Sequence, residues 1–328
     1  FADKLEYLDE KPLEYTSALG IDSQFTDGLA ETELKLKFVV ENKLTLDDIE
    51  VFSRSEVKDI RVSNIVMGRD INGGNIKILV NKQGMDVSGS IKLGTIPTEL
   101  FWRENFSEKT NFKRRYVLKT HIDDSKKIAE FGLDADHIVY DLFRGSMNAE
   151  FEYTFFSDVR RRLEVKADIS NLELSAPIFG WSKVRGAPGK ASFKVKFDGG
   201  YASEISSFSI DAADLELKGR SVFNKSDGSL KRIDFEKIVL GRTNIKGALI
   251  AREDGGWDAG FHGASFELTP TWNDIFSKQS EYGETKTLKL PSLNLAVDFR
   301  RVWISQKDFL ENVSGTLIHI NDLWRTVL

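Results

Sequence analysis

The chain has 328 residues, of which 41% are hydrophobic and 30% charged, and its net charge is −5. This composition excludes a disordered chain, and the acidic balance gives no overall attraction to nucleic acid or to an anionic membrane surface. The absence of cysteine excludes disulfides, thiolate metal sites and cysteine nucleophiles. The chain begins with Phe1 and shows neither a signal peptide nor a run of 18 apolar residues. We expect an interior piece of a larger protein, with any membrane anchor outside it.

Three short helices are predicted along the chain. The first runs roughly from Pro12 to Leu19, the second follows Asp123 or Asp124 and ends at Gly132, and the third runs from Thr269 through Phe276. Each has a capping residue or a proline near its start, and the first two have a glycine at or just past the end.

Strands are predicted by alternation of apolar and polar residues. In chain order the apolar members are Leu34, Leu36 and Phe38; Met85, Val87, Ile91 and Leu93; Met147, Ala149, Phe151, Tyr153 and Phe155; Leu163, Val165, Ala167 and Ile169; Phe193, Val195 and Phe197; and Leu215 and Leu217. A period of two indicates half-buried strands with one apolar and one solvated face.

Glycine turns separate these strands. The predicted hairpin turns are Asn72–Gly74, Asp198–Gly200, Asp227–Gly228 and Asp254–Gly256. Hairpins join antiparallel neighbours, so the predicted fold class is all-β with few short helices, arranged as a long antiparallel meander.

Two pairs of landmarks indicate an internal repeat. Gly20 and Gly132 are 112 residues apart (132 − 20), and Gly68 and Gly180 have the same spacing (180 − 68). The predicted repeats cover residues 12–122 and 123–265, with a partial third at 266–328, in one continuous segment. The apolar face must be buried by a second sheet, by closure into a barrel or by curling into an open groove, and the pattern leaves all three open.

Several short motifs in a fixed order resemble a known family. They are Ala18-Leu19-Gly20-Ile21-Asp22, Gly28 with Ala30-Glu31, Leu34-Lys35-Leu36, Gly68-Arg69-Asp70-Ile71, Val87-Ser88-Gly89, Trp102-Arg103-Glu104-Asn105-Phe106, Gly180-Trp181, Pro188-Gly189, Leu240-Gly241-Arg242-Thr243 and Asp254-Gly255-Gly256-Trp257. Their order resembles the AsmA-like C-terminal region of YhdP-related proteobacterial envelope proteins, over most of residues 12–270.

The resemblance implies a repeating β-groove of the bridge-like lipid transfer superfamily, a long twisted antiparallel sheet curled into an open apolar groove. Such proteins are anchored in the inner membrane and extend into the periplasm. They are thought to conduct phospholipid acyl chains toward the outer membrane, in outer-membrane lipid homeostasis. The implied partners are therefore phospholipids, and a membrane reached through an anchor outside this chain. An apolar groove offers an acyl chain about 0.8 kcal/mol per buried methylene, much as a bilayer does.

Nine residues are the candidate groove lining, because each occupies the apolar phase of its predicted strand. They are Leu36, Val87, Ile91, Phe151, Tyr153, Val165, Phe193, Val195 and Leu217. The lysines and glutamates between them are expected to face solvent.

No catalytic or metal-binding pattern is found. His121, His137, His262 and His319 lack a second ligand at metal spacing, and the sequence has no nucleophile elbow or dinucleotide fingerprint. The segment Gly186–Ser192 lacks the glycine and the Ser or Thr that a phosphate loop requires. We therefore expect no enzyme activity, no cofactor, no metal and no nucleic-acid partner.

Two basic clusters, Lys113–Arg115 and Arg160–Arg162, have two interpretations. They can be solvated strand ends, or a lip that contacts lipid phosphates. Three functions also stay open: a lipid-conducting groove, a scaffold module for envelope assembly without lipid transport, and a hydrolase with a β-rich cleft. An open or a sealed apolar face distinguishes the first two, and polar residues converging inside the groove would indicate the third.

Overall fold

The computed structural model describes residues 26–39, 49–66, 69–107, 109–124, 127, 143–176, 180–199, 201–270, 291–320 and 323–327. Apart from single helical turns at Lys127 and at Thr269 and Pro270, the regular structure assigned in these ranges is β-strand, which confirms the all-β fold class. The chain divides into two compact units. Unit 1 comprises Phe1–Asp141 and Gly145–Ala167, and unit 2 comprises Leu142–Arg144 and Asp168–Leu328.

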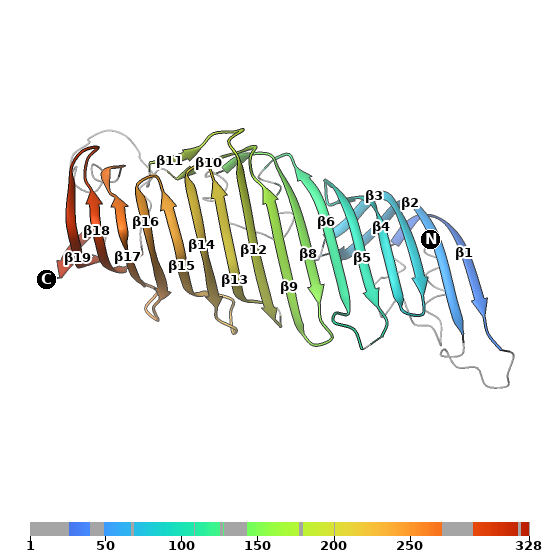
Figure 1. Ribbon diagram of the computed structural model, residues 1–328. Coiled ribbons are helices and arrows are strands. Elements are labelled where there is room, and N and C mark those ends of the chain that lie inside the picture. Colours follow the sequence, from blue (N-terminus) through green and yellow to red (C-terminus); the bar gives the residue numbers. More distant parts are fainter. Residues whose placement is uncertain are drawn as a thin grey trace. The chain divides into compact units, whose positions relative to one another are not determined.

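Unit 1 is a meander in which consecutive strands are neighbours (Figure 1). Its strands are β1 (Thr26–Lys37), β2 (Glu50–Val66), β3 (Arg69–Asn81), β4 (Gly84–Leu93), β5 (Ile96–Asn105), β6 (Arg114–Ile122), β8 (Met147–Phe155) and β9 (Arg160–Asp168). The pairs from β1 to β8 are antiparallel, and a backbone bond from Phe156 N to Arg160 O, 3.1 Å long, closes the turn into β9.

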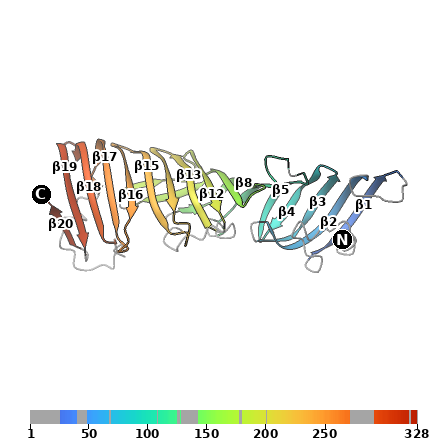
Figure 2. The same cartoon turned by 90° about the horizontal axis from the view of Figure 1, so that it is seen from below.

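Unit 2 repeats this arrangement (Figure 2). Its main strands are β12 (Gly189–Asp198), β13 (Tyr201–Ala212), β14 (Leu215–Phe223), β15 (Leu230–Leu240), β16 (Thr243–Ala251), β17 (Trp257–Glu267), β18 (Leu293–Trp303), β19 (Phe309–Ile320) and β20 (Leu323–Val327). Among the described residues no strand pairing joins β1 to β9 or β12 to β20, so the main sheet does not close into a barrel within either unit.

Three of the four predicted hairpin turns are confirmed. Asp198 and Gly199 lead from β12 into β13, Gly228 lies between β14 and β15, and Gly255 lies between β16 and β17. All three glycines have positive φ (72°, 72° and 80°), the conformation that tight turns demand. The chiefly antiparallel pairing expected from these turns is also confirmed.

The predicted turn at Asn72–Gly74 is wrong. These residues lie inside β3, where Gly73 and Gly74 have φ of 113° and 131°. The register between β3 and β4 shifts between Ile71 and Gly74, so the glycines form a β-bulge. A glycine pair with positive φ serves a bulge as well as a turn, and local sequence does not separate the two.

One pair of neighbours departs from the antiparallel rule. β17 and β18 are parallel, with Trp257 opposite Leu293 and Glu267 opposite Trp303. A parallel pair requires a crossover connection, and here residues 268–292 connect the two strands.

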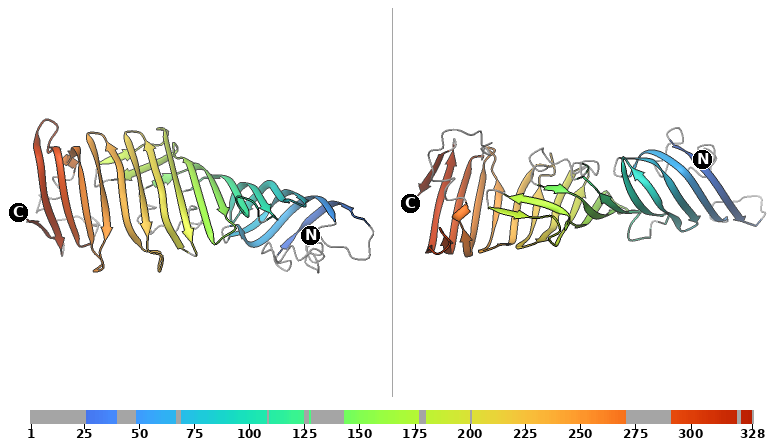
Figure 3. Two further views of the ribbon diagram at one scale, coloured as in Figure 1. Left: turned by 60° about the horizontal axis from the view of Figure 1, so that its bottom comes forward. Right: turned by 90° about the horizontal axis from the view of Figure 1, so that it is seen from above.

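A small second sheet belongs to unit 2. It consists of β7 (Phe143–Gly145), β10 (Leu172–Ala176) and β11 (Trp181–Lys183), with β10 in the centre (Figure 3). The side chain of Lys183, on β11, packs against Gly189 at the start of β12 in the main sheet. A Cβ added to Gly189 would lie only 2.9 Å from that side chain.

The predicted helices at 12–19 and 123–132 lie largely outside the described residues, as do Gly20, Gly68 and Gly132. Of the third predicted helix, Thr269–Phe276, only Thr269 and Pro270 are described, and both are helical. The three-fold repeat therefore stays a prediction.

Candidate functional site

The apolar residues of unit 1 form cross-strand rows on one face of its sheet. One row places Leu100, Leu118 and Phe151 directly opposite one another on β5, β6 and β8. The next row along the strands consists of Trp102, Tyr116 and Tyr153. All six side chains are buried, and Phe151 is only 2% exposed.

The five candidate lining residues on β4, β8 and β9 belong to this buried face. They are Val87, Ile91, Phe151, Tyr153 and Val165. Val87 lies opposite Trp102, and Tyr153 lies opposite Tyr116. Leu36 differs, because it is 52% exposed near the end of β1. Its cross-strand neighbour is Val51, so the apolar face is open to solvent at this position.

Unit 2 carries a longer and more accessible apolar face. Its central row contains, in strand order from β12 to β18, Phe193, Phe208, Gly219, Phe235, Gly247, Phe261 and Val297. Every phenylalanine in this row is half-buried. Of the remaining candidates, Val195 is buried and Leu217 is half-buried.

Glycines bring the phenylalanines of this row into contact. Phe208 and Phe235 have ring centroids 6.2 Å apart across Gly219, and Phe235 and Phe261 have centroids 6.0 Å apart across Gly247. A Cβ on Gly219 would lie 2.6 Å from the Phe208 ring and would collide with the Asp234 carbonyl oxygen. At Gly219 and Gly247 the neighbouring strand therefore lies too close on the apolar side for any residue with a Cβ.

A charged group borders the aromatic row of unit 1. Glu104 is opposite Arg114, and Arg114 Nε lies 2.5 Å from Glu104 Oε2. Trp102 Nε1 donates to the same carboxylate at 3.1 Å, so the buried Glu104 is satisfied by two donors. Burial raises the pKa of Tyr116, which lies beside this pair, to about 12.

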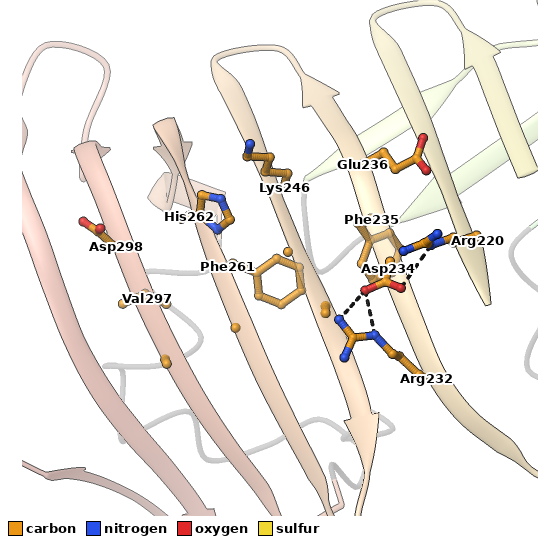
Figure 4. A pocket seen from close by; sticks show the side chains of 14 residues that line it. Arg220, Arg232, Asp234, Phe235, Glu236, Lys246, Phe261, His262, Val297 and Asp298 are labelled. Carbon is orange, nitrogen blue, oxygen red and sulfur yellow. Dashed lines mark hydrogen bonds and ion pairs between the residues drawn. The ribbon is translucent and has the colours of Figure 1, made fainter. Parts of the chain in front are cut away.

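The sheet of unit 2 has a shallow depression of about 630 Å³, whose lining includes Phe235, Phe261 and Val297 of the central row beside charged residues (Figure 4). Its floor consists of small residues at neighbouring register positions, Ala248, Gly260 and Ala296. On one side Asp234 pairs with both Arg220 and Arg232. The charges around the depression are of both signs, so it has no net preference for a cation or an anion.

The histidines do not converge. His121 Nδ1 lies 2.8 Å from Asn148 Oδ1, buried His319 lies 3.1 Å from the Pro291 carbonyl oxygen, and His262 is exposed. His137 is outside the described residues. Within the described ranges no three His, Asp or Glu side chains gather as metal ligands, and no helix there is long and apolar enough to span a membrane.

Sequence reasoning missed two features of these faces. Phe208, Phe235 and Phe261 were not among the candidates, although a glycine at an apolar strand position, such as Gly219 or Gly247, signals a close approach. The pairing of Glu104 with Arg114 had no local signal, because it depends on the register between β5 and β6.

Comparison with known proteins gives no relative. No family model, no curated protein and no solved structure matches this chain.

Proposed function

We propose that this chain is a segment of an inner-membrane-anchored periplasmic protein, and that its apolar faces form an open groove that carries phospholipid acyl chains between membranes. The observation that supports this most is the central row of unit 2, a half-buried line of phenylalanines that crosses β12 to β17 without a charged residue. The resemblance of the sequence to the AsmA-like family supports the periplasmic location and the lipid-carrying function in this proposal.

The physical chemistry of the row suits an acyl chain. Phenylalanine rings offer apolar surface, and each methylene moved from water onto it gains about 0.8 kcal/mol. Because the row continues from strand to strand, an acyl chain that moves along it exchanges one apolar contact for another. Movement along the row then costs little free energy, as a conduit requires.

The glycines favour a sheet that bends into an open groove, and not a flat sheet. At Gly219 and Gly247 an added Cβ would meet the backbone carbonyl oxygen of the next strand, on the apolar side. Gly89 in unit 1 has the same relation to the Asn75 carbonyl oxygen. When neighbouring strands approach each other more closely on one face, the sheet bends toward that face. Glycine permits such bending, because it has no side chain.

A scaffold module that carries no lipid is the alternative. The burial of unit 1 favours it, because Val87, Phe151 and Val165 are closed to water. A face of this kind has the properties of a packed interior, and an acyl chain reaches it only from a half-buried margin such as Phe155. The two functions therefore make different predictions for the two units, with lipid contact strongest in unit 2.

Lipid binding by the purified chain tests the proposal. We expect a fluorescent acyl-chain phospholipid to bind, and Phe235→Asp to weaken binding, because the carboxylate resists desolvation by several kcal/mol. Glu236→Gln is the matched control, since Glu236 is the exposed sequence neighbour of the half-buried Phe235. Absence of binding to the folded wild-type chain would favour the scaffold.

A further inference from the structure

The two basic clusters, 45 residues apart in the sequence (160 − 115), meet at one edge of the unit 1 sheet. Lys113 N donates to Phe155 O at 2.9 Å, and Arg114 lies directly opposite Phe155 in the β6–β8 register. Phe156 N donates to Arg160 O, so the second cluster starts where β8 ends. The edge is the lower one in Figure 1, where β5 and β8 end.

Polarity changes in steps toward this edge. The first of the two rows described above is aliphatic and aromatic (Leu100, Leu118, Phe151), and the second is amphipathic (Trp102, Tyr116, Tyr153). A third row, nearest the edge, contains the charged pair and one phenylalanine (Glu104, Arg114, Phe155). Rows on one face are two residues apart, which corresponds to about 6.6 Å along a strand. A bilayer has the same sequence of zones, with Trp and Tyr between the acyl chains and the charged headgroups.

Two guanidinium groups flank Phe155. The Arg114 guanidinium carbon lies 5.9 Å from the centroid of its ring, and that of Arg161 lies 5.6 Å from it. Arg161 is two residues before the buried Leu163 on β9 and so shares its face, which places both arginines on the apolar side of the sheet. The polar-side residues Arg160 and Arg162 instead stack on Phe156.

The two flanking arginines differ in their charge balance. Arg114 is neutralised by Glu104 at 2.5 Å. Arg160 and Arg162, the sequence neighbours of Arg161, pair with Asp158 and Glu164. Arg161 is exposed, and within the described part of the chain it forms no ion pair with a carboxylate. Among the described arginines of this edge it is therefore the one whose charge is left for an external anion.

We propose that Arg161 binds the phosphate of a phospholipid whose acyl chains enter the apolar face of unit 1 over Phe155. A guanidinium matches phosphate in charge and in its forked geometry. The half-buried Phe155 is where the buried aromatic row first meets water, so a lipid arriving from solvent contacts this edge before any deeper residue. Glu104 neutralises Arg114, which leaves the Arg161 guanidinium as the free charge on the apolar side of this edge for a phosphodiester. This assignment rests on the proposed function and adds a headgroup site to it.

Binding of two fluorescent lipids with the same acyl chains, phosphatidylglycerol and diacylglycerol, tests the site in the full chain. Wild-type protein should prefer phosphatidylglycerol. Arg161→Ala should weaken phosphatidylglycerol binding about tenfold, the loss of one charge-assisted contact, and leave diacylglycerol binding unchanged. Arg160→Ala is the matched control, because it removes the same charge one residue away on the opposite side, and it should change neither affinity.

The outcomes separate this site from the proposed function. Binding of both lipids that is insensitive to Arg161→Ala overturns the headgroup site and leaves the groove standing. Equal losses for the two lipids mean that Arg161 supports the apolar face alone, which also overturns it. Inorganic phosphate that displaces phosphatidylglycerol at millimolar concentration identifies a general phosphate site and overturns the lipid assignment. Failure of the wild-type chain to bind either lipid removes both proposals.

Discussion

Phe208 and Phe235 lie on strands separated by β14, and their rings nevertheless meet edge to face with centroids 6.2 Å apart. Gly219 stands between them and makes the contact possible. Gly219→Ala should lower the free energy of unfolding by about 2 kcal/mol, because the new methyl group would collide with the Asp234 carbonyl oxygen and press on Phe208. Urea denaturation followed by tryptophan fluorescence measures the change.

Gly260→Ala is the control for this prediction. Gly260 precedes Phe261 on β17 and so lies on the opposite face of the sheet, where an added Cβ meets nothing within 4 Å. Its substitution should leave stability unchanged or slightly raised, since alanine restricts the unfolded chain. Equal destabilisation by the two alanines would contradict the role assigned to Gly219.

Glu104→Ala should destabilise unit 1 by about 3 kcal/mol. The substitution leaves the guanidinium of Arg114, which is 19% exposed, without its partner, and removes the acceptor of Trp102 Nε1. Glu152→Ala breaks a more exposed pair with Arg115 and should cost about 1 kcal/mol or less. Chemical denaturation of the two variants side by side checks the ranking, and the reverse order would refute the importance of the buried pair.

Alkaline pH should weaken the fold through Tyr116. Burial raises the pKa of Tyr116 from 10.0 to about 12, so the unfolded chain loses this proton at a lower pH than the folded chain. The contribution of protonated Tyr116 to the free energy of unfolding, roughly 2–3 kcal/mol, is fully present below pH 10. It is lost as the pH rises toward 12. Tyr116→Phe should flatten the fall of unfolding free energy in this window, relative to the wild type. A parallel fall in both proteins would show that Tyr116 titrates normally.

Lys183→Met should destabilise unit 2 by about 2 kcal/mol. Lys183 is 1% exposed, and its Nζ donates to the carbonyl oxygens of Ser170 and Leu172, each at 2.9 Å. Burial lowers the pKa of its ammonium group, but the loss of the donor leaves buried carbonyls unpaired. Lys190→Met, on the exposed side of β12, should have little effect, and thermal unfolding of the two variants compares them. Matching melting temperatures would contradict the structural role of Lys183.

Local alternation predicted the strands well, because each strand presents one face to an apolar interior whatever its partner is. The runs around Val87, Phe151 and Val195 all became strands with those residues inward. Turn chemistry predicted three hairpins for the same reason, since positive φ is a local requirement.

Long-range relationships were not accessible from the sequence. The bulge at Gly73–Gly74 depends on the register of β4, and the parallel pairing of β17 with β18 depends on the connection between them. Leu36 has the right phase but is exposed, because burial depends on the neighbours that a strand acquires in the fold. The meeting of Arg114 and Arg161 at Phe155 likewise follows from pairing across three strands.

The most direct test of the groove is photo-crosslinking in living cells that produce the protein. A photoreactive residue placed at Phe193 would face the apolar side of β12, and one at Lys194 would face the opposite side. We expect phospholipid adducts at Phe193 and none at Lys194. Equal labelling at the two positions, or none at either, would contradict it.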